Sequence, residues 1–411
     1  MSQTELLAVL ADTGLPDPLD MAERNHLLLV KNAATKLLKM ASFDQLIEME
    51  SSLASKAEIS LSHHLAVKLA KSRKAIEGLS GPVHVSVVFA AYKEHTRIVT
   101  RDDHEHGEDF LVRKAQQLDW LADSTPHLTW DLTLVDDGCP EGTGKIAQQI
   151  IEDKELGERV KVLFLEDAIA AKAPMAVGLN STADSQKGGA VLHGMWTAAQ
   201  ESHKGTHVVI FTDADLSTHL GQVGLLLDPI LTGRAQVAIG SRREPTSSVI
   251  KVGTRNNRGK LFIYLWKRLL PELKGIIDTQ CGFKAFRADT LEKILDGVSE
   301  RKFAFDIELL IKAAKAGYST ERVPLAWIDS DAASTTADIQ PYLPMLNSVV
   351  GYFRRYEEPN PTSEAFANLI ERIDQTTWNR MVDNVPASIV DHEPMELEDW
   401  AGVSAEDLAK I

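Results

Sequence analysis

The chain has 411 residues, a formal net charge of −15 and two cysteines. The acidic balance excludes nonspecific nucleic-acid binding, which needs clustered Lys and Arg, and two cysteines cannot build a disulfide framework or a multi-cysteine zinc site. No apolar run approaches the roughly 20 residues of a membrane-spanning helix, and the N-terminus is acidic where a secretory signal starts basic. We therefore expect a soluble, cytoplasmic protein.

Residues 1–80 are expected to form a helical extension. Apolar residues recur every three or four positions across residues 20–56 and again across 62–81, which is the spacing of amphipathic helices. The pair Gly81-Pro82 then marks a boundary. The sequence leaves open whether these helices pack on the following domain or join two copies of the chain as a homodimer.

From residue 83 onward, apolar strands alternate with helices. Strands are expected at residues 83–92, 128–138, 159–166, 206–215 and 235–242. Helices are expected at residues 110–123, 144–157, 188–202 and 303–318. Because the strands are apolar on both faces, this pattern predicts an α/β domain with a mostly parallel sheet covered on both sides. We assign residues 81–335 to this domain and residues 336–411 to a C-terminal extension, with a helical stretch at 363–385 and an acidic tail.

Polar residues follow four of the predicted strands, and ligands bind at the carboxyl ends of strands in such sheets. The four strand ends read "AAYKEH", "VDDGCPEGT", "FTDADLS" and "GSRRE". Asp213 and Asp215 offer the hard oxygen ligands that suit Mg²⁺ or Mn²⁺, although the same segment is typical of a helix cap. The segment "VDDG", residues 135–138, is typical of a turn or of carboxylates that recognise a nucleobase or ribose.

Three other segments are polar. Residues 187–189, Lys-Gly-Gly, are expected at a helix start, where glycines let a ligand approach and Lys187 adds positive charge. The Walker and Rossmann glycine patterns are absent, which counts against a P-loop ATPase and a dinucleotide dehydrogenase.

Asp306 lies in the first turn of the helix at 303–318, where acids are common. The loop "DDHEHGED", residues 102–109, offers metal ligands but is more typical of a solvated loop.

Seven segments in chain order resemble the inverting nucleotide-sugar glycosyltransferases of the GT-A fold, which has a Rossmann-like sheet. Within that fold they most resemble the dolichyl- and polyprenyl-phosphate glucosyl- and mannosyltransferases. The segments are "FAAYKE", "LVDDGCPEGT", "KGGAVLHGM", "DADLST", "IGSR", "DTQCGFKAF" and "FAFDIELL". The last two are closest to the dolichyl-phosphate glucosyltransferase branch. The N- and C-terminal extensions lie outside the resemblance.

The resemblance implies a role for each matching residue on the donor side. Tyr92 and Glu94 contact the nucleoside, Asp137 contacts the base, and Lys187 and Arg242 bind the diphosphate. The same site includes three small or apolar positions, Ala90, Val135 and Ala214.

The resemblance also implies the residues around the reacting atoms. Asp213 contacts the nucleotide and is a second candidate metal ligand beside Asp215, which holds Mg²⁺ or Mn²⁺. Asp306 is either the general base for a hydroxyl acceptor or a group that orients a phosphate acceptor. The acceptor side is formed by Gln280, Cys281 and Gly282, and Cys281 has no partner in the sequence that supports thiolate chemistry.

The sequence departs from these relatives around the acceptor. Ala90 replaces a proline, residues 166–186 form an insertion, and residues 327–340 lack the Gly-Ser-Lys of the lipid-glycosylating relatives. We therefore expect metal-dependent transfer of glucose or a related hexose, from a UDP-sugar rather than a GDP-sugar, to an unidentified soluble acceptor. One alternative is a peripheral polyprenyl-phosphate glycosyltransferase whose basic, aromatic segment 255–270 contacts a bilayer, unless that segment is a core helix. The others are a sugar nucleotidyltransferase and a non-catalytic sugar-nucleotide-binding protein.

Overall fold

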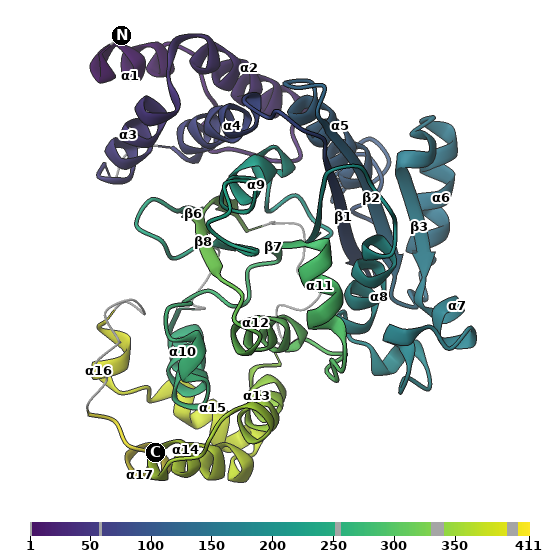
Figure 1. The fold of residues 1–411 in the computed structure, drawn as a ribbon. Helices are drawn as coiled ribbons and strands as arrows, with labels where there is room; N and C mark the ends of the chain where they lie inside the picture. Colours follow the sequence, from purple (N-terminus) through teal and green to yellow (C-terminus); the bar gives the residue numbers. More distant parts are fainter. Residues whose placement is uncertain (1, 57–59, 251–255, 330–340, 393–401) are drawn as a thin grey trace.

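A seven-stranded sheet forms the centre of the molecule (Figure 1). The structure is a computed structural model that describes residues 2–56, 60–250, 256–329, 341–392 and 402–411. The strand order is β3-β2-β1-β4-β7-β5-β8. The strands are β1 (Val83–Ala91), β2 (Leu128–Asp136), β3 (Val160–Phe164), β4 (Thr206–Thr212), β5 (Val237–Ser241), β7 (Phe283–Arg287) and β8 (Thr320–Pro324). β7 is antiparallel to β4 and β5 and the other pairs are parallel, so the predicted α/β class with a mostly parallel sheet is confirmed.

The five strands expected from the sequence are all present, but the sequence analysis missed the antiparallel strand β7 inside "DTQCGFKAF". It also missed β8 and a small second sheet of β6 (Ser248–Ile250) and β9 (Ala326–Ile328). β6 and β9 have three residues each, which is too short for a clear alternation of polar and apolar positions. β7 and β8 are as long as the predicted β3 and β5, but Gly282 directly precedes β7 and Lys284 lies within it, while β8 begins with three polar residues.

Helices cover both faces of the sheet. Val88 and Phe211 face a core shared with α8 (Gly188–Ala199), α11 (Ala288–Leu295) and α12 (Phe305–Lys315). Val87 and Ile210, one residue earlier on the same strands, face a second core shared with α5 (Phe110–Ala122), α6 (Thr143–Asp153) and α9 (Val223–Leu231). Because successive side chains of a strand point to opposite faces, both faces need apolar residues, and this explains the unbroken apolar strands.

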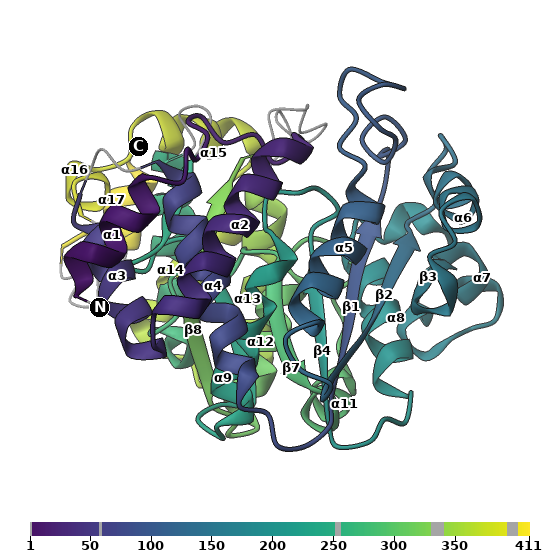
Figure 2. The same cartoon turned by 90° about the horizontal axis from the view of Figure 1, so that it is seen from above.

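The N-terminal helices pack on the α9 side of the sheet (Figures 1 and 2). They are α1 (Gln3–Ala11), α2 (Arg24–Met40), α3 (Phe43–Ala54) and α4 (Leu61–Glu77). α4 contacts α9, and the buried Lys68 Nζ donates both to Glu50 and, at 3.1 Å, to the Pro324 carbonyl at the end of β8. Packing on the sheet domain is thus observed within one chain, while dimerisation through these helices stays a prediction.

The C-terminal helices pack around α10 (Asn256–Leu269) and share its core with α8 and α12. They are α13 (Tyr342–Tyr356), α14 (Pro361–Arg372), α15 (Gln375–Asp383), α16 (Ala387–Val390) and α17 (Ala405–Ala409). The stretch expected to be helical at 363–385 is split, because Asp374 starts a new helix by accepting the Thr377 N–H at 2.8 Å.

Several sequence expectations fall on residues outside the described ones. The boundary between residues 335 and 336 and most of the segment 327–340 lie there, as does much of the acidic tail. Within the described residues, no helix has both the length and the apolar character needed to span a membrane.

We predict that Gly224→Ala destabilises the protein by about 1–3 kcal/mol. A Cβ at Gly224 in α9 would overlap the backbone oxygen of Ser72, so α4 and α9 would have to separate. Urea unfolding followed by circular dichroism measures the change.

Gly351→Ala is the matched control, since Gly351 also lies in a helix, α13, and a Cβ there meets no atom of the described residues within 4 Å. This substitution should be neutral or stabilise by up to about 1 kcal/mol, because alanine has the higher helix propensity. Equal effects of the two substitutions would contradict close packing of α4 on α9.

Candidate active site

The polar residues singled out in the sequence meet at one edge of the sheet. β1, β2, β4 and β5 run parallel, so the residues that follow them share the carboxyl edge. β7 lies antiparallel between β4 and β5 and therefore starts at this edge, which brings residues 278–282 to the same place. Tyr92, Asp137, Asp213 and Arg242 thus come together from segments far apart in the sequence.

Lys187 connects the ends of β2 and β4. Its backbone N–H donates to Asp137 Oδ2 at 2.7 Å, and its side chain donates to Asp213 Oδ1. Within the described parts of the chain, the buried Asp137 Oδ1 has no hydrogen-bond partner. Burial raises the pKa of Asp137 to about 6, although hydrogen bonds from Ser185 and Lys187 lower it in part. This residue therefore holds a free acceptor oxygen next to a lysine.

The two carboxylates of "VDDG" have different roles. Asp136 accepts the backbone N–H groups of Gly138 at 3.0 Å, Cys139 at 2.9 Å and Gly144 at 2.7 Å. It thus closes the turn and holds the start of α6, as the turn interpretation of this segment expects. Asp137 is left to face the other elements of the site.

The glycines after Lys187 serve internal packing. A Cβ at Gly188 would overlap the carbonyl oxygen of Lys302, and Gly189 N donates to Arg301 O at 2.8 Å. We expected these glycines to let a ligand approach the backbone. The structure shows another reason for them: they let the start of α8 lie against the segment that precedes α12. Lys187 itself has a positive φ of 82°, so it ends its loop in a strained conformation.

Asp213 packs directly against Gly282. A Cβ at Gly282 would overlap the carboxylate of Asp213, so glycine is required for this carboxylate to keep its place. Burial alone would raise the pKa of Asp213, but Lys187, followed by Arg242 and Lys114, outweighs burial and lowers it. Asp213 is thus held ionised.

Asp215 keeps one oxygen with few contacts. Its Oδ1 accepts the Ser217 N–H at 3.0 Å, while Oδ2 lies 3.7 Å from Arg97 Nη1, too far for a hydrogen bond. The buried Lys114 donates to the backbone oxygen of Asp215 at 2.6 Å. The sequence analysis missed both cations because each is a single residue with no pattern around it.

Glu94 is paired with Arg97, which donates to it through Nε at 2.6 Å and through Nη2. Its predicted contact with a nucleoside would have to compete with this ion pair. Tyr92, in contrast, is 48% exposed and presents an aromatic ring at the carboxyl edge. Among the three small positions, Val135 and Ala214 are buried and Ala90 is half-buried, so their side chains pack within the wall of the site.

Asp306 lies in the first turn of α12 and is buried. Lys284 Nζ of β7 donates to its Oδ2 at 3.1 Å and to the Cys281 carbonyl at 2.7 Å. Among the described residues nothing hydrogen-bonds to Asp306 Oδ1. Burial raises the pKa of Asp306, although Lys284 and Lys187 oppose that shift. A buried carboxylate with a raised pKa and a free oxygen has the features of a general base.

Arg242 is held by Asp278. Its backbone N, Nε and Nη2 each donate to the Asp278 carboxylate at 2.8 Å, and its guanidinium lies 5.1 Å from the centre of the Trp327 ring. Gln280 donates to Met345 Sδ at 3.3 Å. Arg242, Asp278, Gln280 and Trp327 line a cavity of about 100 Å³. The other lining residues are Gly259, Phe262 and Ile263 of α10, Tyr342 of α13, and, outside these helices, Arg243, Ile277, Thr279 and Asp329.

Cys281 lies in the wall of the site. Its side chain is fully buried, and burial raises the pKa of the thiol to about 12. The thiol is therefore neutral at physiological pH and is not presented to an acceptor. The backbone of Cys281, which binds Lys284, takes part in positioning Asp306.

The loop at residues 102–109 contacts the candidate site through Glu108. The Oε2 of Glu108 accepts the Leu216 N–H at 3.1 Å, next to Asp215 in the sequence. Among the described residues, the groups of three or more His, Cys, Asp or Glu that could hold a metal lie elsewhere, around His84 and His203. Asp213 and Asp215 form no such group.

Comparison with known proteins identifies sequence relatives. No family model matches the chain. It is 30% identical over 203 residues to the polyprenol monophosphomannose synthase of Mycolicibacterium smegmatis, covering 49% of this chain and 67% of that protein. It is 28% identical over 265 residues to the dolichyl-phosphate beta-glucosyltransferase of Saccharomyces cerevisiae, covering 61% of this chain and 69% of that protein. The chain also matches glycosyltransferase AglD of Haloferax volcanii at 25% identity, but spans 35% of its length.

Among solved structures, glucosyl-3-phosphoglycerate synthase of M. tuberculosis superposes with a TM-score of 0.45 at 19% identity, covering 72% of this chain and 87% of that chain. A TM-score of this size adds nothing to the assignment, which rests on the sequence relatives. The chain therefore belongs to the GT-A glycosyltransferase family that contains the dolichyl-phosphate glucosyltransferases and the polyprenol-phosphate mannosyltransferases.

Proposed function

We propose that the chain transfers a hexose, most favourably glucose, from a UDP-sugar to a hydroxyl group of a small soluble acceptor. One observation carries the proposal: Lys187 binds both Asp137 and Asp213 and is close enough to Asp306 for their charges to interact. In the described structure, Asp137 and Asp306 each have a buried oxygen without a hydrogen-bond partner. Such oxygens point to a ligand that supplies the missing donors.

The nucleoside is assigned to Tyr92 and Asp137. The exposed ring of Tyr92 offers a flat surface on which a base can stack. Asp137 has a pKa of about 6, so above that pH it is an ionised acceptor for a base N–H such as the single imide N–H of uracil. This match of one donor to one free oxygen supports a uridine nucleotide.

The diphosphate is assigned to two cations, Lys187, which precedes α8 and binds Asp213 after β4, and Arg242, which follows β5. Asp215 fits a hard divalent cation, because carboxylate oxygens are the ligands that Mg²⁺ and Mn²⁺ prefer and its Oδ2 is in an ion pair with Arg97 at 3.7 Å but not in a hydrogen bond with it. When bound there, such an ion would stabilise the negative charge of the departing diphosphate. Asp213, held by Lys187 and Gly282, supports the position of the same loop.

Asp306 is assigned as the base that accepts the proton of the acceptor hydroxyl through Oδ1. Lys284 holds Oδ2 at 3.1 Å and so orients the carboxylate. A single displacement, in which the acceptor attacks the anomeric carbon opposite the diphosphate, inverts the configuration at that carbon.

A polyprenyl phosphate is the second candidate acceptor, because relatives are named for dolichyl- and polyprenol-phosphate substrates. A phosphate is already anionic and needs no base. The segment expected to contact a bilayer is α10, and its Phe262, Tyr264 and Trp266 are buried in the core with α13 and α14. This burial supports the core-helix interpretation of that segment and favours the soluble acceptor.

The two remaining alternatives receive less support. The sequence relatives described above are glycosyltransferases, which does not favour a sugar nucleotidyltransferase. A non-catalytic sugar-nucleotide-binding protein would not need the raised pKa and the free oxygen of Asp306.

We predict that the chain with Mn²⁺ releases UDP from UDP-glucose in the presence of a soluble hydroxyl acceptor, and that Asp215→Ala lowers turnover about 10²–10³-fold. The measurement is UDP release with a panel of soluble acceptors and with undecaprenyl phosphate in vesicles. Asp167→Ala, at an exposed position on α7 (Leu165–Ala170), is the control and should keep full activity.

The proposal fails if no nucleotide sugar is turned over, or if Asp215→Ala is as active as the unaltered chain. Turnover with undecaprenyl phosphate alone would overturn the soluble acceptor and favour the lipid acceptor.

We predict that activity falls as pH falls through the raised pKa of Asp306, because the base must be ionised to accept a proton. Asp306→Asn should lower kcat by about 10²–10⁴-fold. Lys284→Met removes a cation that lowers the pKa of Asp306, so the acid limb of the profile should move to higher pH. The measurement is kcat against pH, and an unmoved acid limb in Lys284→Met would show that Asp306 is not the titrating group.

We predict that Gly282→Ala lowers kcat/KM for the nucleotide sugar by about 10²-fold, the scale of a misplaced catalytic group. The reason is that the new Cβ displaces the carboxylate of Asp213. Cys281→Ser, at the neighbouring buried position, is the control: it should lower the melting temperature but retain most of the activity. The measurement is steady-state kinetics of both variants. A larger loss of kcat/KM in Cys281→Ser than in Gly282→Ala would contradict the prediction and make Cys281 the functional residue.

A further inference from the structure

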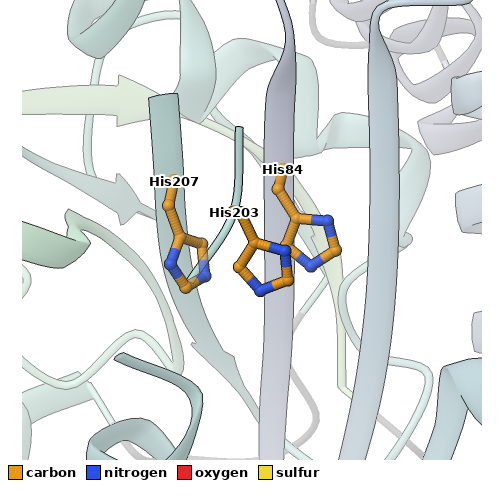
Figure 3. A group of neighbouring side chains, drawn as sticks. All are labelled: His84, His203 and His207. Atoms are coloured by element: carbon orange, nitrogen blue, oxygen red, sulfur yellow. The ribbon is translucent and has the colours of Figure 1, made fainter. Parts of the chain in front are cut away.

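A cluster of three histidines lies at the edge of the sheet opposite the candidate active site (Figure 3). His84 and His207 are the second residues of β1 and β4, and they are direct neighbours in the parallel register. His203 lies in the connection between α8 and β4. Since β4 has seven residues, the cluster lies roughly 20 Å from Asp213 at the other end of that strand.

The three rings are in mutual contact. The rings of His84 and His203 are stacked, with centroids 3.5 Å apart and planes at 4°. The His207 ring lies 4.5 Å from His203 and 5.4 Å from His84, at 63° and 62°. One ring nitrogen from each histidine lies within 4.8 Å of the others.

Carboxylates adjoin the histidines. His84 Nε2 lies 2.8 Å from Asp131 Oδ2, which also accepts from Ser86 Oγ at 3.1 Å. Asp131, Glu201 and His203 form a second group whose ligand atoms lie within 4.8 Å of one another. Glu201 is bound by the charged Lys161 at 2.7 Å, whereas Asp131 Oδ2 contacts His84, one of the three histidines, and the neutral hydroxyl of Ser86.

His203 is the histidine of the cluster whose Nε2 lacks a hydrogen bond in the described structure. Its Nε2 is buried, and no group in the described parts of the chain forms a hydrogen bond with it; the Glu201 carboxylate is 3.7 Å away. A buried ring nitrogen without a hydrogen-bond partner is a candidate ligand position.

We propose that His84, His203 and His207, with the Asp131 carboxylate as fourth ligand, form a binding site for a divalent transition metal ion, best matched by Zn²⁺. Three imidazole nitrogens and one carboxylate oxygen are a ligand set that suits Zn²⁺ in four-coordinate geometry. This set differs from the all-oxygen environment of Asp215, which suits Mg²⁺ or Mn²⁺. The site joins β1, β2, β4 and the connection after α8, and its role is to stabilise the fold at this edge.

Binding requires one ring to turn, because two parallel stacked rings cannot both direct a lone pair at one ion. His84 is held at both ring nitrogens, Nδ1 by Thr129 at 2.8 Å and Nε2 by Asp131 at 2.8 Å. To bind the ion, His84 keeps its proton on Nδ1, which donates to Thr129, and Nε2 gives up its hydrogen bond with Asp131 so that both groups bind the ion. His203 lies outside the strands and carries the unpaired nitrogen. His203 is therefore the ligand that moves, and its substitution is the most direct test.

The test is isothermal titration of the untagged full-length chain with ZnCl₂ alone, in the Asp215→Ala background so that the active-site carboxylate does not contribute. One equivalent of Zn²⁺ should bind and raise the thermal unfolding midpoint. His203→Ala and His207→Asn should each weaken binding at least about 10–100-fold. Co²⁺ in place of Zn²⁺ should give the visible absorption of a four-coordinate site, and excess Mg²⁺ should not displace it.

His104→Ala and His106→Ala, at a half-buried and an exposed position of the loop at 102–109, are the matched controls and should bind Zn²⁺ as tightly as the background chain. The proposal is overturned if the background chain shows no saturable Zn²⁺ binding, or if binding is unchanged in both His203→Ala and His207→Asn. Because the readout needs neither nucleotide sugar nor turnover, its failure is distinct from failure of the proposed transferase activity.

Discussion

Lys187 joins two strand ends through two different groups, and the rest of the candidate site depends on it. Its backbone N–H binds Asp137 after β2 and its side chain binds Asp213 after β4. Lys187 can reach both because Gly188 lets the start of α8 lie against the chain just before α12. The first turn of α12 carries Asp306, so one close backbone contact sets Asp137 and Asp213 relative to Asp306.

The site balances its acidic groups with buried or half-buried cations. Asp213 is bound by Lys187, Asp278 by Arg242 and Asp306 by Lys284. These pairs fix the side chains, because removing one partner would leave a buried charge unpaired. Under the proposed function, an entering diphosphate would have to share these cations with their carboxylates or bring a cation of its own. That requirement would be a physical reason for the proposed divalent ion at Asp215, separate from any resemblance.

The sequence predicted the α/β fold and the edge at which polar residues meet, because both follow from apolar strands that end in carboxylates. It did not predict β7, because Gly282 directly precedes this strand and Lys284 interrupts its apolar residues. It could not separate Asp136 from Asp137, because the difference depends on which one the turn's backbone amides reach. Arg97 approaches Asp215 through tertiary packing, which leaves no local signal.

The histidine cluster also leaves no local signal in the sequence. His84 and His207 come together because β1 and β4 are neighbours in the parallel register, whereas the histidines of the loop at 102–109 are close together in the sequence itself. β1 and β4 thus connect two chemically different places, imidazoles where they begin and hard oxygens where β4 ends. An ion at the first place would fix the register of these two strands without contacting the second. The stability of the fold would then depend on Zn²⁺ and the transfer of the sugar on Mg²⁺ or Mn²⁺. Chelators that prefer one of these metals would therefore change one property without the other.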